Sequence, residues 1–121
     1  MNDGTNNTIN SSSEMKNKVR KKVMEFYEAY YKADRLNIYC SLDTSFQRQV
    51  PLNYFLIHTN YNIEMGRLLN INEVEVKEEK RMAFVECEIQ VNDEIKDIVF
   101  ILKKDFGGWK MDGESIFKRT F

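Results

Sequence analysis

The hydrophobic period of this chain changes at Gly66, and that change limits the fold more than any other feature. Before Gly66, apolar residues recur three or four positions apart, which is typical of helices with one buried face. After Gly66, apolar and polar residues alternate, which is typical of strands with one wet face. The first set begins with Val19, Val23, Phe26, Tyr27 and Tyr30, and the second includes Val85, Cys87, Ile89 and Val91. Helices that precede an antiparallel sheet predict an α+β fold.

The helical half divides into several segments. Ser11 and Glu14 have the spacing of a capping box, which predicts a helix from there to about Ala33. Residues 36–42 predict a short second helix, and residues 43–49 a further turn. Pro51 suits the first position of a helix and Gly66 suits a helix end, so the apolar positions from Leu52 to Ile63 predict a third helix.

The second half predicts a meander of about four strands. Alternating residues cover 73–77 and 85–91, and an Asn92-Asp93 turn leads into the apolar run 95–104. Gly107-Gly108 turns the chain into a last strand over 109–121. The apolar face of this sheet needs a cover, and the helices supply it. We therefore expect a curved antiparallel sheet wrapped around the long N-terminal helix.

The first thirteen residues, MNDGTNNTINSSS, are almost all small and polar. Such a composition is typical of a flexible linker, so we divide the chain into a leader (1–13) and one domain (14–121). Two interpretations stay open. Met1 replaces an upstream membrane anchor of an extracytoplasmic protein, or the segment is the native start of a cytoplasmic one.

The charge balance and the cysteine count exclude several classes of protein. The formal net charge is −1, which argues against a nucleic-acid-binding protein. No apolar run is long enough to predict a transmembrane segment. A single histidine and two cysteines, Cys40 and Cys87, are too few for a zinc site, and no motif indicates a cofactor. Cys40 and Cys87 form a disulfide if the protein is exported; otherwise we expect two buried thiols.

Five basic residues lie close together in the first helix, in the run Lys16 to Lys22. Cations at this end of a helix oppose its dipole, so the helix itself does not require them. They form either a solvated face or a surface that meets anionic lipid or a partner.

The order of these elements resembles the NTF2-like superfamily of cone-shaped α+β proteins. The resemblance covers about residues 16–121 and rests on the opening helix VMEFYEAYYKAD, the segment ending in MGRL, and the closing pair VFILKKDFGGWKMDG. It implies a similarity to small Gram-positive accessory domains, which often follow a lipoprotein signal or belong to secreted, extracellular proteins. Members of this superfamily also include enzymes and assembly parts of secretion machines, so the fold does not fix the function.

The candidate ligand-pocket residues are aromatic or titratable. They are Tyr27, Tyr30, Tyr54, His58 and Trp109. His58 is the natural general acid or base near neutral pH, although a lone histidine among aromatics more often packs than catalyses. Tyr27, Tyr30 and Tyr31 with Asp34 form a second group, but no catalytic motif of the ketosteroid isomerases or dehydratases of this fold matches it. We therefore assign no catalytic residue and no metal ligand.

Glu86 and Glu88 point to one face of their strand, and we expect lysines on neighbouring strands to pair with them. If Val99 and Ile101 share this outer face, it carries an apolar strip that suits a homodimer interface.

Three functions follow from these observations. The first is a non-catalytic accessory or protein-interaction domain with a partner in a cell-envelope assembly. The second is a small-molecule binder that uses the cone interior. The third is an isomerase- or dehydratase-like enzyme with His58, Tyr30 or Asp34 in the pocket.

Overall fold

A computed structural model describes residues 3–118, with side chains from residue 12 onward. The helices are α1 (Asp3–Tyr31), α2 (Arg35–Cys40), α3 (Thr44–Gln49), α4 (Leu52–Ile57) and α5 (Gly113–Phe117), with 3-10 turns η1 (Thr59–Tyr61) and η2 (Glu78–Lys80). The strands are β1 (Arg67–Lys77), β2 (Met82–Val91), β3 (Glu94–Asp105) and β4 (Gly108–Met111). The expected α+β order, with helices first, is confirmed.

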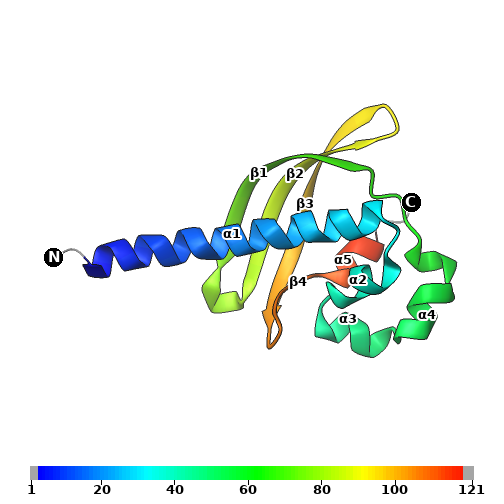
Figure 1. Cartoon of the computed structure of the whole chain (residues 1–121), viewed down its shortest axis with the longest axis horizontal. Coiled ribbons are helices and arrows are strands. Elements are labelled where there is room, and N and C mark those ends of the chain that lie inside the picture. The colour runs from blue at the N-terminus through cyan, green and yellow to red at the C-terminus, as the bar shows by residue number, and fades with distance from the viewer. Residues whose placement is uncertain (1–2, 119–121) are drawn as a thin grey trace.

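The four strands form one open antiparallel sheet in the order β1-β2-β3-β4, as the meander predicts. The long helix α1 lies across one face of this sheet, and α2 to α5 gather near the C-terminal end of α1 (Figure 1). The α1 stripe of Val19, Val23 and Phe26 is buried, as its period predicts. Burial of each such side chain contributes about 1.5–3 kcal/mol, so this layer holds the two halves together.

The boundaries of two predicted helices differ from the expectation. Helix α1 begins at Asp3, upstream of the Ser11–Glu14 capping box, while the division of the chain at residue 14 stays a prediction. The helix expected over 52–63 ends at Ile57, because His58 has an extended backbone. The His58 ring then accepts a hydrogen bond from the Asn60 amide and starts η1.

Two glycines have roles that the sequence analysis did not assign. Gly66 has a φ of +69° and leads into β1 instead of ending a helix, and a Cβ there would collide with the Gln90 carbonyl. The strand expected over 109–121 stops at Met111, because Asp112 caps α5 by accepting a hydrogen bond from the Ser115 amide. Gly113 begins that helix against the Phe46 ring, where a Cβ has no room.

The two cysteines match neither expectation completely. Both are free thiols, and Cys87 is buried while Cys40 is exposed. The prediction that Cys40 is buried is wrong, because the adjacent Tyr39 is the residue of α2 that faces the core.

The outer face of the sheet, opposite α1, is more acidic than expected. Glu86 lies opposite Glu73 and Val99, and Glu88 lies opposite Asp97, so the expected pairing with lysines is wrong. The register places Val99 and Ile101 on this same face, and Val99 is exposed. The predicted apolar strip is therefore present, between carboxylates. Within the described residues, no helix is long and apolar enough to cross a membrane.

Candidate functional site

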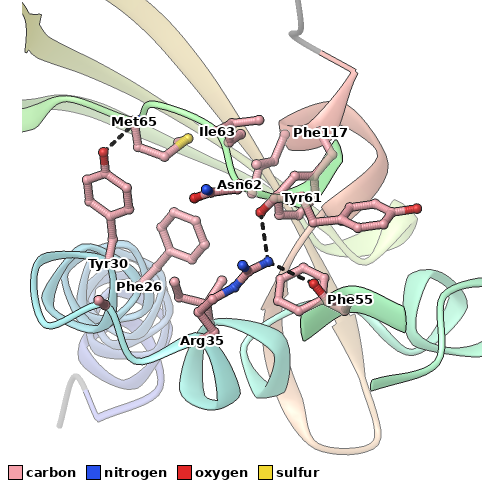
Figure 2. A pocket seen from close by; sticks show the side chains of 12 residues that line it. Phe26, Tyr30, Arg35, Phe55, Tyr61, Asn62, Ile63, Met65 and Phe117 are labelled. Atoms are coloured by element: carbon pink, nitrogen blue, oxygen red, sulfur yellow. Dashed lines mark hydrogen bonds between the residues drawn. The ribbon is translucent and has the colours of Figure 1, made fainter. Parts of the chain in front are cut away.

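A small cavity lies where the helices meet the end of the sheet, as seen in Figure 2. Its volume is about 120 Å³, and its walls are mainly apolar. Pockets for drug-sized ligands measure about 300–1,000 Å³, so this one fits a much smaller molecule. The lining residues are Phe26, Tyr30, Ala33, Arg35, Ile38, Phe55, Tyr61, Asn62, Ile63, Met65, Ile116 and Phe117.

Arg35, the first residue of α2, brings a charge into this apolar cavity. Its guanidinium donates hydrogen bonds to the carbonyls of Phe55 (2.7 Å) and Tyr61 (3.3 Å), drawn as dashed lines in Figure 2. It also lies 5.2 Å from the centre of the Phe55 ring, in the range of a cation–π contact. No described carboxylate forms an ion pair with it, and none lines the cavity. The cavity thus presents a positive charge without a counter-charge.

Tyr30 is the other polar group of interest on the wall. Its hydroxyl donates a hydrogen bond to the Glu64 carboxylate (3.1 Å) and accepts one from the Met65 amide (3.0 Å). Burial, reinforced by the Glu64 charge, raises the pKa of Tyr30 above its usual value. The hydroxyl therefore stays protonated at neutral pH and can act as a hydrogen-bond donor, not as a base.

The structure does not bring the five predicted pocket residues together. Tyr30 lines the cavity. Tyr27 is buried in the core beside it, and its hydroxyl donates to the Met65 carbonyl (2.9 Å). Tyr54 and His58 stack on each other with ring centres 4.7 Å apart, outside the cavity lining. Trp109 belongs to a separate groove beside α1.

The remaining chemical candidates have structural partners. Asp34 caps α2 by accepting hydrogen bonds from the amide and side chain of Asn37. The Tyr31 hydroxyl accepts from the Leu68 amide and so ties α1 to β1. Among the side chains that the structure describes, no three of His, Cys, Asp or Glu cluster closely enough to hold a metal ion.

Sequence reasoning missed Arg35. It is one basic residue among eighteen, and its neighbours predict only the start of a short helix. Its importance depends on carbonyls twenty and twenty-six residues further along the chain. No local pattern could have indicated that arrangement.

A second feature is the exposed apolar surface of α4, the helix that contains Phe55. Residues 49–63 contain no Asp, Glu, Lys or Arg, although charged residues make up 31% of the chain. Within α4, Phe55 is buried while Leu52, Tyr54, Leu56 and Ile57 are exposed. We call the exposed set, together with His58, the α4 patch. Ile57 is 79% exposed, although isoleucine is among the residue types most often fully buried.

Comparison with known proteins identifies no relative: no family model, no curated protein and no solved structure matches this chain.

Proposed function

We propose that this chain is an NTF2-like accessory domain that works by binding a protein partner through the α4 patch. The observation that carries the proposal is the contrast within α4. One side chain, Phe55, secures the helix to the core, and its apolar neighbours face solvent. Contiguous exposed apolar surface rimmed by polar residues is typical of a protein-interaction site.

The α4 patch is held in a fixed position from behind. Phe55 packs against Tyr39, Tyr61 and Phe117, with ring centres 5.2–5.6 Å apart. Arg35 holds the Phe55 carbonyl near the end of the helix. A rigid patch loses little entropy on binding, which favours affinity. Tyr54 adds an amphipathic ring, a residue type enriched at interface hot spots.

The cellular location of this protein and its partner is inferred from the sequence and is part of the proposal. The polar composition of residues 1–13 and the resemblance to Gram-positive accessory domains support an extracytoplasmic, anchored protein with a partner in the cell envelope. The outer sheet face, with Val99 and Ile95 exposed, is the alternative interface, and it suits a homodimer.

Site-specific photo-crosslinking tests the proposal. A photoreactive amino acid at Ile57 should give an adduct with one partner in the native host, and excess wild-type chain should compete with it. Excess Ile57→Asp chain should not compete, because the charge disrupts the patch. The matched control carries the photoreactive residue at Ile95, which is similarly exposed. A dimer-sized adduct from Ile95 and none from Ile57 would contradict the proposal in favour of a homodimer through the sheet.

The cavity supports a second candidate function, the binding of a small carboxylate with an apolar body. An unneutralised guanidinium beside aromatic walls suits such a ligand, since Arg pairs with carboxylates through two parallel hydrogen bonds. An apolar cavity of about 150 Å³ accommodates benzene. A cavity of about 120 Å³ takes a smaller apolar body, so propionate is a suitable probe. Propionate should raise the melting temperature more than propionamide, its neutral analogue. Equal or absent shifts would remove this candidate.

A further inference from the structure

The end of the molecule that holds the β3–β4 turn combines an exposed aromatic tip with a cluster of lysines. Phe106 and Gly107 form the two-residue turn between the paired residues Asp105 and Gly108. Phe106 is fully exposed, and no aromatic contact joins its ring to another residue that the structure describes. Turn tips normally carry small polar residues, so folding gives no reason for phenylalanine at this position.

This turn is held firmly in place. The Asp105 carboxylate accepts hydrogen bonds from the Gly107 amide (2.9 Å) and the Thr44 hydroxyl (2.7 Å). Lys110 packs beside Gly107 and donates a hydrogen bond to the Cys40 carbonyl (3.1 Å). The backbone of this turn is therefore held in place, and the turn presents the fully exposed Phe106 side chain at its tip.

A groove of about 310 Å³ runs beside this turn, between α1 and the β3–β4 hairpin. Its cations are Lys18, Lys21 and Lys22 from α1 and Lys104 from β3. The carboxylate in its lining is Glu25, which pairs with Lys22 at 3.4 Å. Within the described residues, the other three lysines have no ion pair. Trp109 forms part of the groove wall, with the Lys104 ammonium 5.9 Å from its ring centre.

Acidic residues gather on the face of the sheet away from this groove. The whole sequence has a formal net charge of −1, so carboxylates elsewhere balance the groove lysines. Some lie on the outer sheet face, where Glu73 lies opposite Glu86 and Glu88 lies opposite Asp97. Glu78 lies nearer, in a smaller groove that also contains Lys104. An anionic surface would orient such a molecule with its basic groove inward.

We propose that the Phe106 tip and the groove lysines dock the protein onto an anionic phospholipid surface. The lysines would contact lipid phosphates while Phe106 enters the interfacial layer of the bilayer. An acidic protein could neutralise the lysines equally well. Phe106 distinguishes the two kinds of partner, because its turn contains no other exposed apolar side chain. A protein partner would need a dedicated pocket for this ring, whereas a bilayer takes up one apolar wedge without shape complementarity. The lipid surface is therefore the occupant that both features fit.

Vesicle flotation with the full chain tests this inference. The chain should bind vesicles that contain phosphatidylglycerol and not vesicles of phosphatidylcholine alone, and added salt should weaken binding through screening. Phe106→Ala should lower the partition coefficient about tenfold. Replacing Lys18, Lys21 and Lys104 together by Gln should lower it about 100-fold. Phe106→Trp should keep binding, and its emission should shift to shorter wavelength on the anionic vesicles.

Matched controls come from the opposite end of the sheet. Ile95→Ala removes an exposed apolar side chain beside the β2–β3 turn, and Lys96→Gln removes an exposed cation there. Both should bind like the wild type. Failure of the wild type to bind anionic vesicles at low salt would overturn the inference. So would a fall in the partition coefficient of Ile95→Ala as large as that of Phe106→Ala. Tight binding to polyglutamate without binding to vesicles would overturn it in favour of an acidic protein. The α4 patch is a separate surface, so none of these results decides the proposed function.

Discussion

The Arg35 guanidinium holds Phe55 twice, through a 2.7 Å hydrogen bond to its carbonyl and a contact 5.2 Å from its ring centre. Phe55 in turn is the buried side chain of α4. The position of the α4 patch therefore depends on Arg35, a residue of the cavity wall that is not part of the patch.

We expect Arg35→Gln to destabilise the fold by about 2 kcal/mol, because hydrogen bonds from a charged donor and a cation–π contact are lost together. Urea unfolding followed by circular dichroism measures this change. The matched control is Arg67→Gln, which removes an exposed arginine bonded to the Gln90 side chain (2.9 Å) and should change stability by less than about 0.5 kcal/mol. Equal midpoints for the two variants would show that Arg35 does not secure α4.

Truncation of two residues of α4 should change the stability of the fold by very different amounts. Phe55→Ala removes a fully buried ring and should cost about 3–5 kcal/mol of unfolding free energy. Ile57→Ala, two residues later, should cost less than about 0.5 kcal/mol, because Ile57 is 79% exposed. The same Ile57→Ala variant should lose partner crosslinking from other positions of the α4 patch. A large stability loss from Ile57→Ala would mean that the patch belongs to the core, which would remove it as an interaction surface.

The sequence predicts the layers of this fold because they depend on local periodicity. Val19, Val23 and Phe26 share one helix face wherever the helix begins or ends. Val85 and Cys87 likewise share one strand face. The predicted meander follows from short turns, which leave few alternatives for neighbouring strands. These features need no knowledge of residues far along the chain.

The candidate site depends on non-local contacts, which the sequence pattern does not contain. Residues 52–63 have apolar positions that a longer helix would satisfy equally well, and the observed end at Ile57 follows from His58 and from Arg35, twenty residues before Phe55. The position of Glu73 opposite Glu86 could not be predicted either, because irregularities in β1 near Leu69 and Asn72 shift the pairing of β1 with β2.

The two thiols should react at very different rates. Burial raises the pKa of Cys87 to about 12, so almost none of it is thiolate at neutral pH, and its side chain is inaccessible. Cys40 is exposed. Ellman's reagent should therefore label one thiol in the folded protein and two in guanidinium. Cys40→Ser should abolish the folded-state reaction, while Cys87→Ser should leave it unchanged. Two thiols of equal reactivity in the folded state would contradict the placement of Cys87.

The turn that presents Phe106 should lose stability in acid. Burial alone would raise the pKa of Asp105, but hydrogen bonds from Thr44 and Gly107 outweigh it and lower that pKa below 3.8. A carboxyl whose pKa is lower in the folded state stabilises the fold above its unfolded pKa. This contribution is lost as the pH falls through the folded pKa, below 3.8.

Asp105→Asn tests this, since the amide oxygen can still accept a hydrogen bond from Gly107 but no longer titrates. Its melting temperature should fall less than that of the wild type as the pH drops from neutral to below 3.8. Asp93→Asn, in the exposed β2–β3 turn, is the control and should follow the wild-type curve. If Asp105→Asn and Asp93→Asn have the same acid dependence, Asp105 does not hold the turn. The anchored turn that presents Phe106, on which the proposed membrane docking relies, would then lack this support.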